Sequence, residues 1–123
     1  YVPIVSCPVV DASGQLLNLN ADSLVRAVTA TLRFDDVVYV VDVGGVFADL
    51  SNPQSLIPSL RPEEIADLID RGVVQGGMIA KLDEIAQMVG EHVDRAWIVG
   101  ASDDAPVTAA LAGSPGTRTR IER

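Results

Sequence analysis

The sequence predicts an α/β fold in which helices cover both faces of an open, largely parallel sheet, a three-layer αβα arrangement. Two observations lead to this class. Apolar β-branched runs alternate along the chain with segments whose apolar residues recur at helical spacing. In addition, Val37–Val43 is apolar on both faces, which is typical of a parallel strand covered by helices. The chain has 123 residues and is 48% hydrophobic, so we expect residues 1–123 to form a single domain.

The first elements are a predicted hairpin and a helix. The β-branched run Val2–Val10 predicts a buried strand, Asp11–Gly14 a tight turn, and Leu16–Leu19 the returning strand. Apolar residues then recur at positions 21, 24, 25, 28 and 32. This spacing predicts a helix from Ala21 to about Leu32, with Asn20 as its N-cap.

Strands and helices alternate through the rest of the chain. After Val37–Val43, the segment Val46–Arg61 contains two prolines and predicts a loop or an irregular hairpin. Pro62 suits the first position of a helix that runs to Arg71, with acidic residues at the positive end of its dipole. The remaining expected elements are a helix from about Gly77 with Met78, Leu82, Ile85 and Val89 on one face, strand Arg95–Gly100, helix Ala105–Ala112 and a strand around Thr117–Ile121.

Composition argues against several classes of function. Seventeen acidic residues against nine basic ones give a formal charge of −8, which argues against a nucleic-acid or membrane-surface partner, because such binding needs clustered cations. The single cysteine, Cys7, allows no disulfide and offers no metal-ligand spacing, so no metal site is expected and a reducing, cytoplasmic location is favoured. No apolar run approaches the ~20 residues that span a bilayer.

The first candidate site is the sequence DVGGVF, Asp42–Phe47, at the end of the apolar strand. Ligands of open α/β sheets collect beyond the carboxyl ends of strands, and two glycines would let a flat ligand or a phosphate approach the backbone closely. The alternative is a simple turn from strand to loop, in which glycine supplies a positive φ. Spacing alone leaves both interpretations open.

The second candidate is QGGMIAK, which contains Lys81, the only lysine among nine basic residues. Gly76 and Gly77 precede a predicted helix, whose first N–H groups could bind an anion. Lys81 lies three residues after Met78, at the edge of the apolar face. Its ammonium could extend to water along the alkyl stem, or it could meet a phosphoryl oxygen in a pocket too narrow for a guanidinium.

The third candidate is NLNAD, residues 18–22. Asn20 can cap the helix and Asp22 gains from the helix dipole, so both have structural explanations. Asn18 has no capping role. Its amide could hold a substrate, while Asp22 could orient a cationic lysine.

Taken in order, these motifs resemble one family. The stretches PIVSCPVVDASGQLLNLNAD, VVDVGGVF, LRPEEIADLIDRGVVQGGMIAK and GTRTRI together resemble the acetylglutamate kinases of the amino-acid kinase superfamily. The resemblance covers essentially the whole chain and corresponds to the carboxyl-terminal, nucleotide-binding half of such an enzyme. It implies an amino-acid kinase type of fold and a chain that is a fragment of a longer protein.

The resemblance implies ATP-dependent phosphorylation of the side-chain carboxylate of N-acetylglutamate, a step of arginine biosynthesis, with ATP and Mg2+ as cofactors. It makes Lys81 and Asp22 the catalytic residues, Lys81 stabilising the transferring phosphoryl group and Asp22 organising the lysines. Asn18 would bind substrate. The implied nucleotide-binding residues are Asp42, Val43, Gly44, Gly45, Val46, Phe47, Val73, Val74 and Gln75.

The resemblance also implies partners and limits. The family's amino-terminal half, with its early lysine and glycine-rich phosphate loops, is not in this chain, so the isolated chain is expected to be inactive. Family members are often homo-oligomers. Two departures, GASDDAP in place of the usual Asp-Gly-Arg turn and Gly44 in place of the usual proline or serine, leave open a kinase for carrier-bound aminoadipate or glutamate. A separate alternative is a non-catalytic nucleotide-binding or regulatory domain that keeps this half of the fold.

Overall fold

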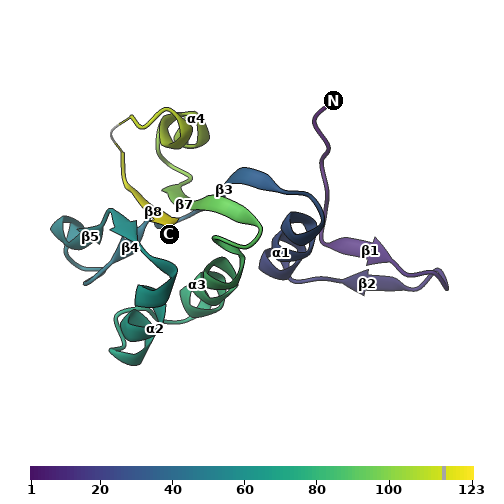
Figure 1. The fold of residues 1–123 in the computed structure, drawn as a ribbon, viewed down its shortest axis with the longest axis horizontal. Coiled ribbons are helices and arrows are strands. Elements are labelled where there is room, and N and C mark those ends of the chain that lie inside the picture. The colour runs from purple at the N-terminus through teal and green to yellow at the C-terminus, as the bar shows by residue number, and fades with distance from the viewer. Residues whose placement is uncertain (115) are drawn as a thin grey trace.

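The structure is a computed structural model that describes residues 1–114 and 116–123. A short hairpin of β1 (Pro8–Val10) and β2 (Leu16–Asn18) comes first and projects from the rest of the fold beside the first helix (Figure 1). The later elements, in chain order, are α1 (Ala21–Thr31), β3 (Phe34–Val41), β4 (Val46–Phe47), the 3-10 turn η1 (Pro53–Ser55), β5 (Leu56–Ile57), β6 (Ser59–Leu60), α2 (Pro62–Asp70), α3 (Gly77–Met88), β7 (Val93–Gly100), α4 (Pro106–Leu111) and β8 (Arg118–Glu122).

The central sheet is mixed but largely parallel, in the order β3-β7-β8-β6. Strands β3 and β7 are parallel, as are β6 and β8, and β7 runs antiparallel to β8. The register pairs Val38 with Trp97 and Ile98 with Thr119. Strands β4 and β5 form a separate antiparallel hairpin, so of the two alternatives predicted for Val46–Arg61, a loop or an irregular hairpin, the structure has the hairpin.

Helices lie on both faces of this sheet, which confirms the predicted three-layer arrangement (Figure 1). Successive residues of a strand point to opposite faces. On β7, Ala96 and Ile98 therefore join the larger core beneath α1, α2 and α3, while Trp97 and Val99 pack with Ala110 of α4 on the other face. The larger core centres on α3, whose Leu82, Ile85 and Met88 are fully buried.

The local signals for helices were reliable. Helix α1 begins after Asn20, whose side-chain oxygen accepts hydrogen bonds from the backbone N–H groups of Asp22 and Ser23. The turn Asp11–Gly14 is also confirmed, because the Asp11 carboxylate accepts from Ser13 and Gln15 and Gly14 takes a positive φ of 87°.

The prediction of a buried strand over Val2–Val10 was wrong. Only Pro8–Val10 forms a strand, and Val2, Ile4 and Val5 are largely exposed. A β-branched run favours extended backbone, but burial requires another layer to pack against it. Within the described residues no element covers this segment, and the hairpin lies apart from the central sheet (Figure 1).

Candidate active site

A cavity of about 200 Å³ lies beyond the carboxyl end of β3. Two segments line it, the one that enters β4 and the one that leads into α3. Its lining residues are Val43, Gly45, Val46, Phe47, Leu50, Val73, Val74, Gln75 and Met78. Most of these side chains are apolar, so the cavity suits a flat, weakly polar group better than a phosphate. Seven of the nine predicted nucleotide-binding residues are among them; Asp42 and Gly44 are not.

The two glycines before β4 have different structural roles. Gly45 takes a φ of 94°, the positive value that a turn requires. Gly44 is buried beside the end of β7, and a Cβ at this position would lie 2.2 Å from the backbone nitrogen of Gly100. The close approach predicted for Gly44 is therefore to another backbone segment of the same chain.

Lys81 and Asp22 form an ion pair between α3 and α1. The Lys81 Nζ lies 2.5 Å from Asp22 Oδ1, and the two side chains are only 18% and 19% exposed. Lys81 therefore does not extend into open solvent, and the snorkelling alternative does not describe its position. The predicted partnership between these two residues is present in the folded chain.

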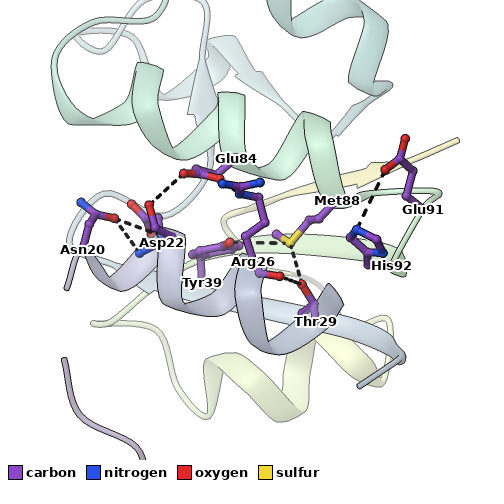
Figure 2. Close-up of polar contacts among 10 residues, drawn as sticks. Asn20, Asp22, Arg26, Thr29, Tyr39, Glu84, Met88, Glu91 and His92 are labelled. Carbon is purple, nitrogen blue, oxygen red and sulfur yellow. Dashed lines mark hydrogen bonds and ion pairs between the residues drawn. The ribbon is translucent and has the colours of Figure 1, made fainter. Parts of the chain in front are cut away.

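The aromatic ring of Tyr39 lies beside this ammonium group. Lys81 Nζ is 4.8 Å from the ring centroid, a distance typical of a cation–π contact. Burial raises the pKa of Tyr39 well above its ordinary value, and the negative charges of Asp22 and Glu84 raise it further. The Tyr39 hydroxyl therefore stays neutral and contacts the Met88 Sδ at 4.0 Å (Figure 2).

A second ion pair of opposite polarity lies one turn further along the same two helices. Arg26 Nε of α1 lies 2.5 Å from Glu84 Oε2 of α3, and the Ser23 hydroxyl donates to Glu84 Oε1 at 2.9 Å (Figure 2). Each helix thus contributes one acid and one base to the contact. Because the two pairs require the same register between α1 and α3, they fix the position of Lys81 along the interface.

Helix α3 connects the ion pair to the cavity. Its N-cap, Gly76, takes φ 59° and ψ −137°, a conformation that glycine tolerates, and no side chain caps the helix. Met78 in the first turn lines the cavity, and Lys81 follows three residues later on a neighbouring part of the helix surface. A molecule in the cavity would therefore lie near the open N-terminus of α3, whereas Lys81 is not among the residues that line the cavity.

Comparison with known proteins identifies the family. The sequence profile of the Amino acid kinase family matches residues 1–100. The chain belongs to this family. Among its curated relatives are acetylglutamate kinases of Methanosarcina barkeri, 39% identical over 83% of this chain and 32% of the relative, and of Methanopyrus kandleri, 41% identical over 74% of this chain and 37% of the relative.

A longer alignment reaches the acetylglutamate kinase of Anaeromyxobacter sp., 34% identical over 95% of this chain and 44% of that protein. The chain spans about a third of the length of the first curated relatives it matches. Solved structures share the amino-acid kinase fold. A Streptococcus mutans protein has a TM-score of 0.70 at 24% identity, covering 95% of this chain and 42% of that protein. Carbamate kinase from Giardia lamblia bound to AMP-PNP has a TM-score of 0.68 at 21% identity, covering 89% and 39%.

The fold of this amino acid kinase family member does not bring all of the predicted site residues together. Asn18 ends the exposed strand β2 opposite Pro8, and its side chain makes no hydrogen bond within the described residues. Asn20 serves as the cap of α1. Asp42 is exposed just beyond β3 and does not line the cavity.

Sequence reasoning missed the pair of Arg26 and Glu84. A usable signal existed, because Arg26 lies four residues after Asp22 and Glu84 three residues after Lys81, which places each pair of residues on one helix face. Elsewhere, residues 1–114 and 116–123 contain no group of three or more histidine, cysteine or acidic side chains placed to hold a metal ion. Within the same residues, every helix is too short or too polar to cross a bilayer.

Proposed function

We propose that this chain is the nucleotide-binding half of an acetylglutamate-kinase-like phosphotransferase. The reaction would transfer the γ-phosphoryl group of ATP to the side-chain carboxylate of N-acetylglutamate. One observation carries the proposal: Met78, which lines the apolar cavity, and Lys81, which is held by Asp22, lie three residues apart on α3. The names of the curated relatives and the AMP-PNP complex of the carbamate kinase support it.

The cavity and the helix end would bind different parts of ATP. The apolar walls around Val46, Phe47 and Val74 suit the adenine base and its ribose. The backbone N–H groups at the start of α3, with the positive end of the helix dipole, suit the phosphates. Residues 1–123 would form one domain in this role.

Lys81 would stabilise the transition state. The transferring phosphoryl group carries charge on its oxygens, so the reaction needs positioned cations more than proton transfer. The ion pair with Asp22 and the ring of Tyr39 restrict the ammonium to one side of α3. Asp22 would thus act by orienting the lysine, and Asn18 would bind the acyl amino acid.

The remaining components would come from outside this chain. Since the described residues contain no cluster of three metal-binding side chains, Mg2+ would be held mainly by phosphate oxygens, water and at most one or two carboxylates. The amino-terminal half of the kinase would complete the acceptor site. We expect the complete protein to be a homo-oligomer.

The test uses the full-length protein, with AMP-PNP binding measured by calorimetry and turnover measured as ADP release. N-acetylglutamate, carrier-bound glutamate and carrier-bound aminoadipate are compared as acceptors. Lys81→Ala is expected to lower kcat on the order of 10²-fold or more, as loss of one transition-state donor does. Arg71→Ala, which removes an exposed cation at the C-cap of α2, is the matched control.

Four outcomes decide the proposal. Turnover with N-acetylglutamate that depends on Lys81 supports it, whereas turnover only with a carrier-bound acceptor replaces the substrate. AMP-PNP binding without turnover on any acceptor would favour a regulatory domain. Unchanged turnover in Lys81→Ala would overturn the role of this lysine.

A further inference from the structure

Thr119 is a buried polar residue that the proposed mechanism does not use. It lies on β8 with an exposure of 0%, and Thr29 is the other buried polar residue among those the structure describes. Burying a hydroxyl without hydrogen-bond partners costs free energy, so a buried threonine is expected to have partners. Those partners show which segments of the chain the hydroxyl connects.

The Thr119 hydroxyl bridges the β4–β5 hairpin to the central sheet. Its Oγ1 accepts a hydrogen bond from the backbone N–H of Val46 at 2.7 Å and donates one to the backbone carbonyl of Ile57 at 2.6 Å. Val46 and Ile57 are directly opposed in the hairpin. One hydroxyl therefore satisfies both strands of the hairpin and ties them to β8.

The same hairpin forms a wall of the cavity. Val46 and its neighbours Gly45 and Phe47 all line the cavity. A Cβ on Gly45 would lie 3.3 Å from Thr119 Oγ1 and 2.6 Å from Leu56 Cδ1, so the chain passes the hydroxyl closely at this point. Because β4 has only two residues, the hydrogen bond that the Val46 N–H donates to Thr119 Oγ1 is one of few restraints on this strand.

We propose that Thr119 is a positioning residue for the nucleotide pocket. Its hydroxyl fixes the backbone of Val46, and thereby the positions of Gly45 and Phe47 against the base. This inference rests on the proposed function, since it assigns a nucleotide to the cavity. Thr119 itself would not touch the nucleotide, but it would set the shape of the cavity wall that touches it.

The test compares Thr119→Val, which keeps the side-chain shape and removes the hydroxyl, with Thr119→Ser, which keeps the hydroxyl. Both are made in the full-length protein, and affinity for AMP-PNP is measured by calorimetry beside the KM for the acyl amino acid. Thr119→Val leaves the Val46 N–H and the Ile57 carbonyl unpaired, so we expect its Kd for AMP-PNP to rise about tenfold or more. Thr119→Ser is expected to stay within about threefold of the parent protein.

Thr29→Val is the matched control, because it removes the hydroxyl of the other buried threonine, which contacts Met88 and does not line the cavity. It is expected to lower the melting temperature and leave the Kd for AMP-PNP unchanged. If Thr119→Val does not fold, Thr119→Cys, with a weaker donor and acceptor, is expected to weaken binding by an intermediate factor.

The outcomes separate this inference from the proposed function. If the parent protein does not bind AMP-PNP, both fail. If it binds and Thr119→Val, or Thr119→Cys where valine prevents folding, retains the parent Kd, the positioning role alone is overturned. An equal loss of affinity in Thr119→Ser and Thr119→Val would also overturn it, since the hydroxyl would then not be the cause.

Discussion

A double-mutant cycle on Asp22 and Lys81 can separate the stability of their ion pair from its role in catalysis. The cycle consists of Asp22→Ala, Lys81→Met and the double variant, each made in the full-length protein. Methionine keeps the unbranched stem of lysine beside Tyr39 and removes the charge. Urea-induced unfolding followed by circular dichroism gives the free energy of unfolding, and ADP release gives kcat.

The burial of the pair sets the expected magnitude. Exposed ion pairs contribute about 0.2–1 kcal/mol, whereas removing one partner of a buried pair costs about 3–5 kcal/mol. At about one-fifth exposure, Asp22 and Lys81 lie between these limits, so each single variant is expected to lose about 2 kcal/mol. The double variant leaves no unpaired ion, and we expect a coupling energy of about 1–2 kcal/mol.

Catalysis is expected to respond differently. The double variant should regain part of the lost stability but none of the lost kcat, because no cation then meets the phosphoryl group. The exposed pair of Asp67 and Arg71 at the end of α2 serves as a control, with an expected coupling energy below about 0.5 kcal/mol. A coupling energy near zero for the buried pair, or a double variant as active as the parent, would refute the reasoning.

Two further predictions concern stability. Gly44→Ala places a Cβ 2.2 Å from the backbone nitrogen of Gly100, and backbone atoms cannot rotate away. Urea unfolding should therefore show that the free energy of unfolding falls by about 3 kcal/mol. Gly77→Ala is the control, because the added Cβ would meet nothing within 4 Å, and it should be neutral or slightly stabilising. Hydrogen bonding from Arg95 holds the pKa of Asp36 below its ordinary value. The ionised Asp36 therefore stabilises the folded state above its unfolded pKa of about 3.9, and this stabilisation is lost as the pH falls through its lower pKa in the folded state. Asp36→Asn should consequently flatten the acid side of a plot of melting temperature against pH.

Signals that lie within a few residues of one another predicted much of this fold. The N-cap Asn20, the turn begun by Asp11 and the proline at the start of α2 each depend on hydrogen bonds or backbone angles inside one short segment. Apolar spacing likewise identified the face of α3 that carries Leu82 and Ile85. These features follow from local chemistry and require no knowledge of the partner element.

The features that could not be predicted depend on partners far apart in the chain. Thr119 accepts a hydrogen bond from the N–H of Val46, which lies 73 residues away in the sequence, and Arg26 forms an ion pair with Glu84 on another helix. A helix period shows which face is apolar but not which element covers it. The same limit explains the wrong prediction for Val2–Val10, since a β-branched run contains no information about what will pack against it.

The arrangement of α3 gives a physical reason for the lone lysine at position 81. Met78 lines the cavity and Lys81 pairs with Asp22, and three residues of a helix rise only about 4.5 Å. Along this length the stem must pass the ring of Tyr39 and still leave the ammonium a single carboxylate partner at 2.5 Å. A thin stem with a compact charge makes this contact at 18% exposure, whereas the guanidinium of Arg26, with its wider fork of donors, pairs with Glu84 at 47% exposure. Lys81 is thus the more buried of the two cations that pair across the contact between α1 and α3, and this difference belongs to the geometry of the chain itself.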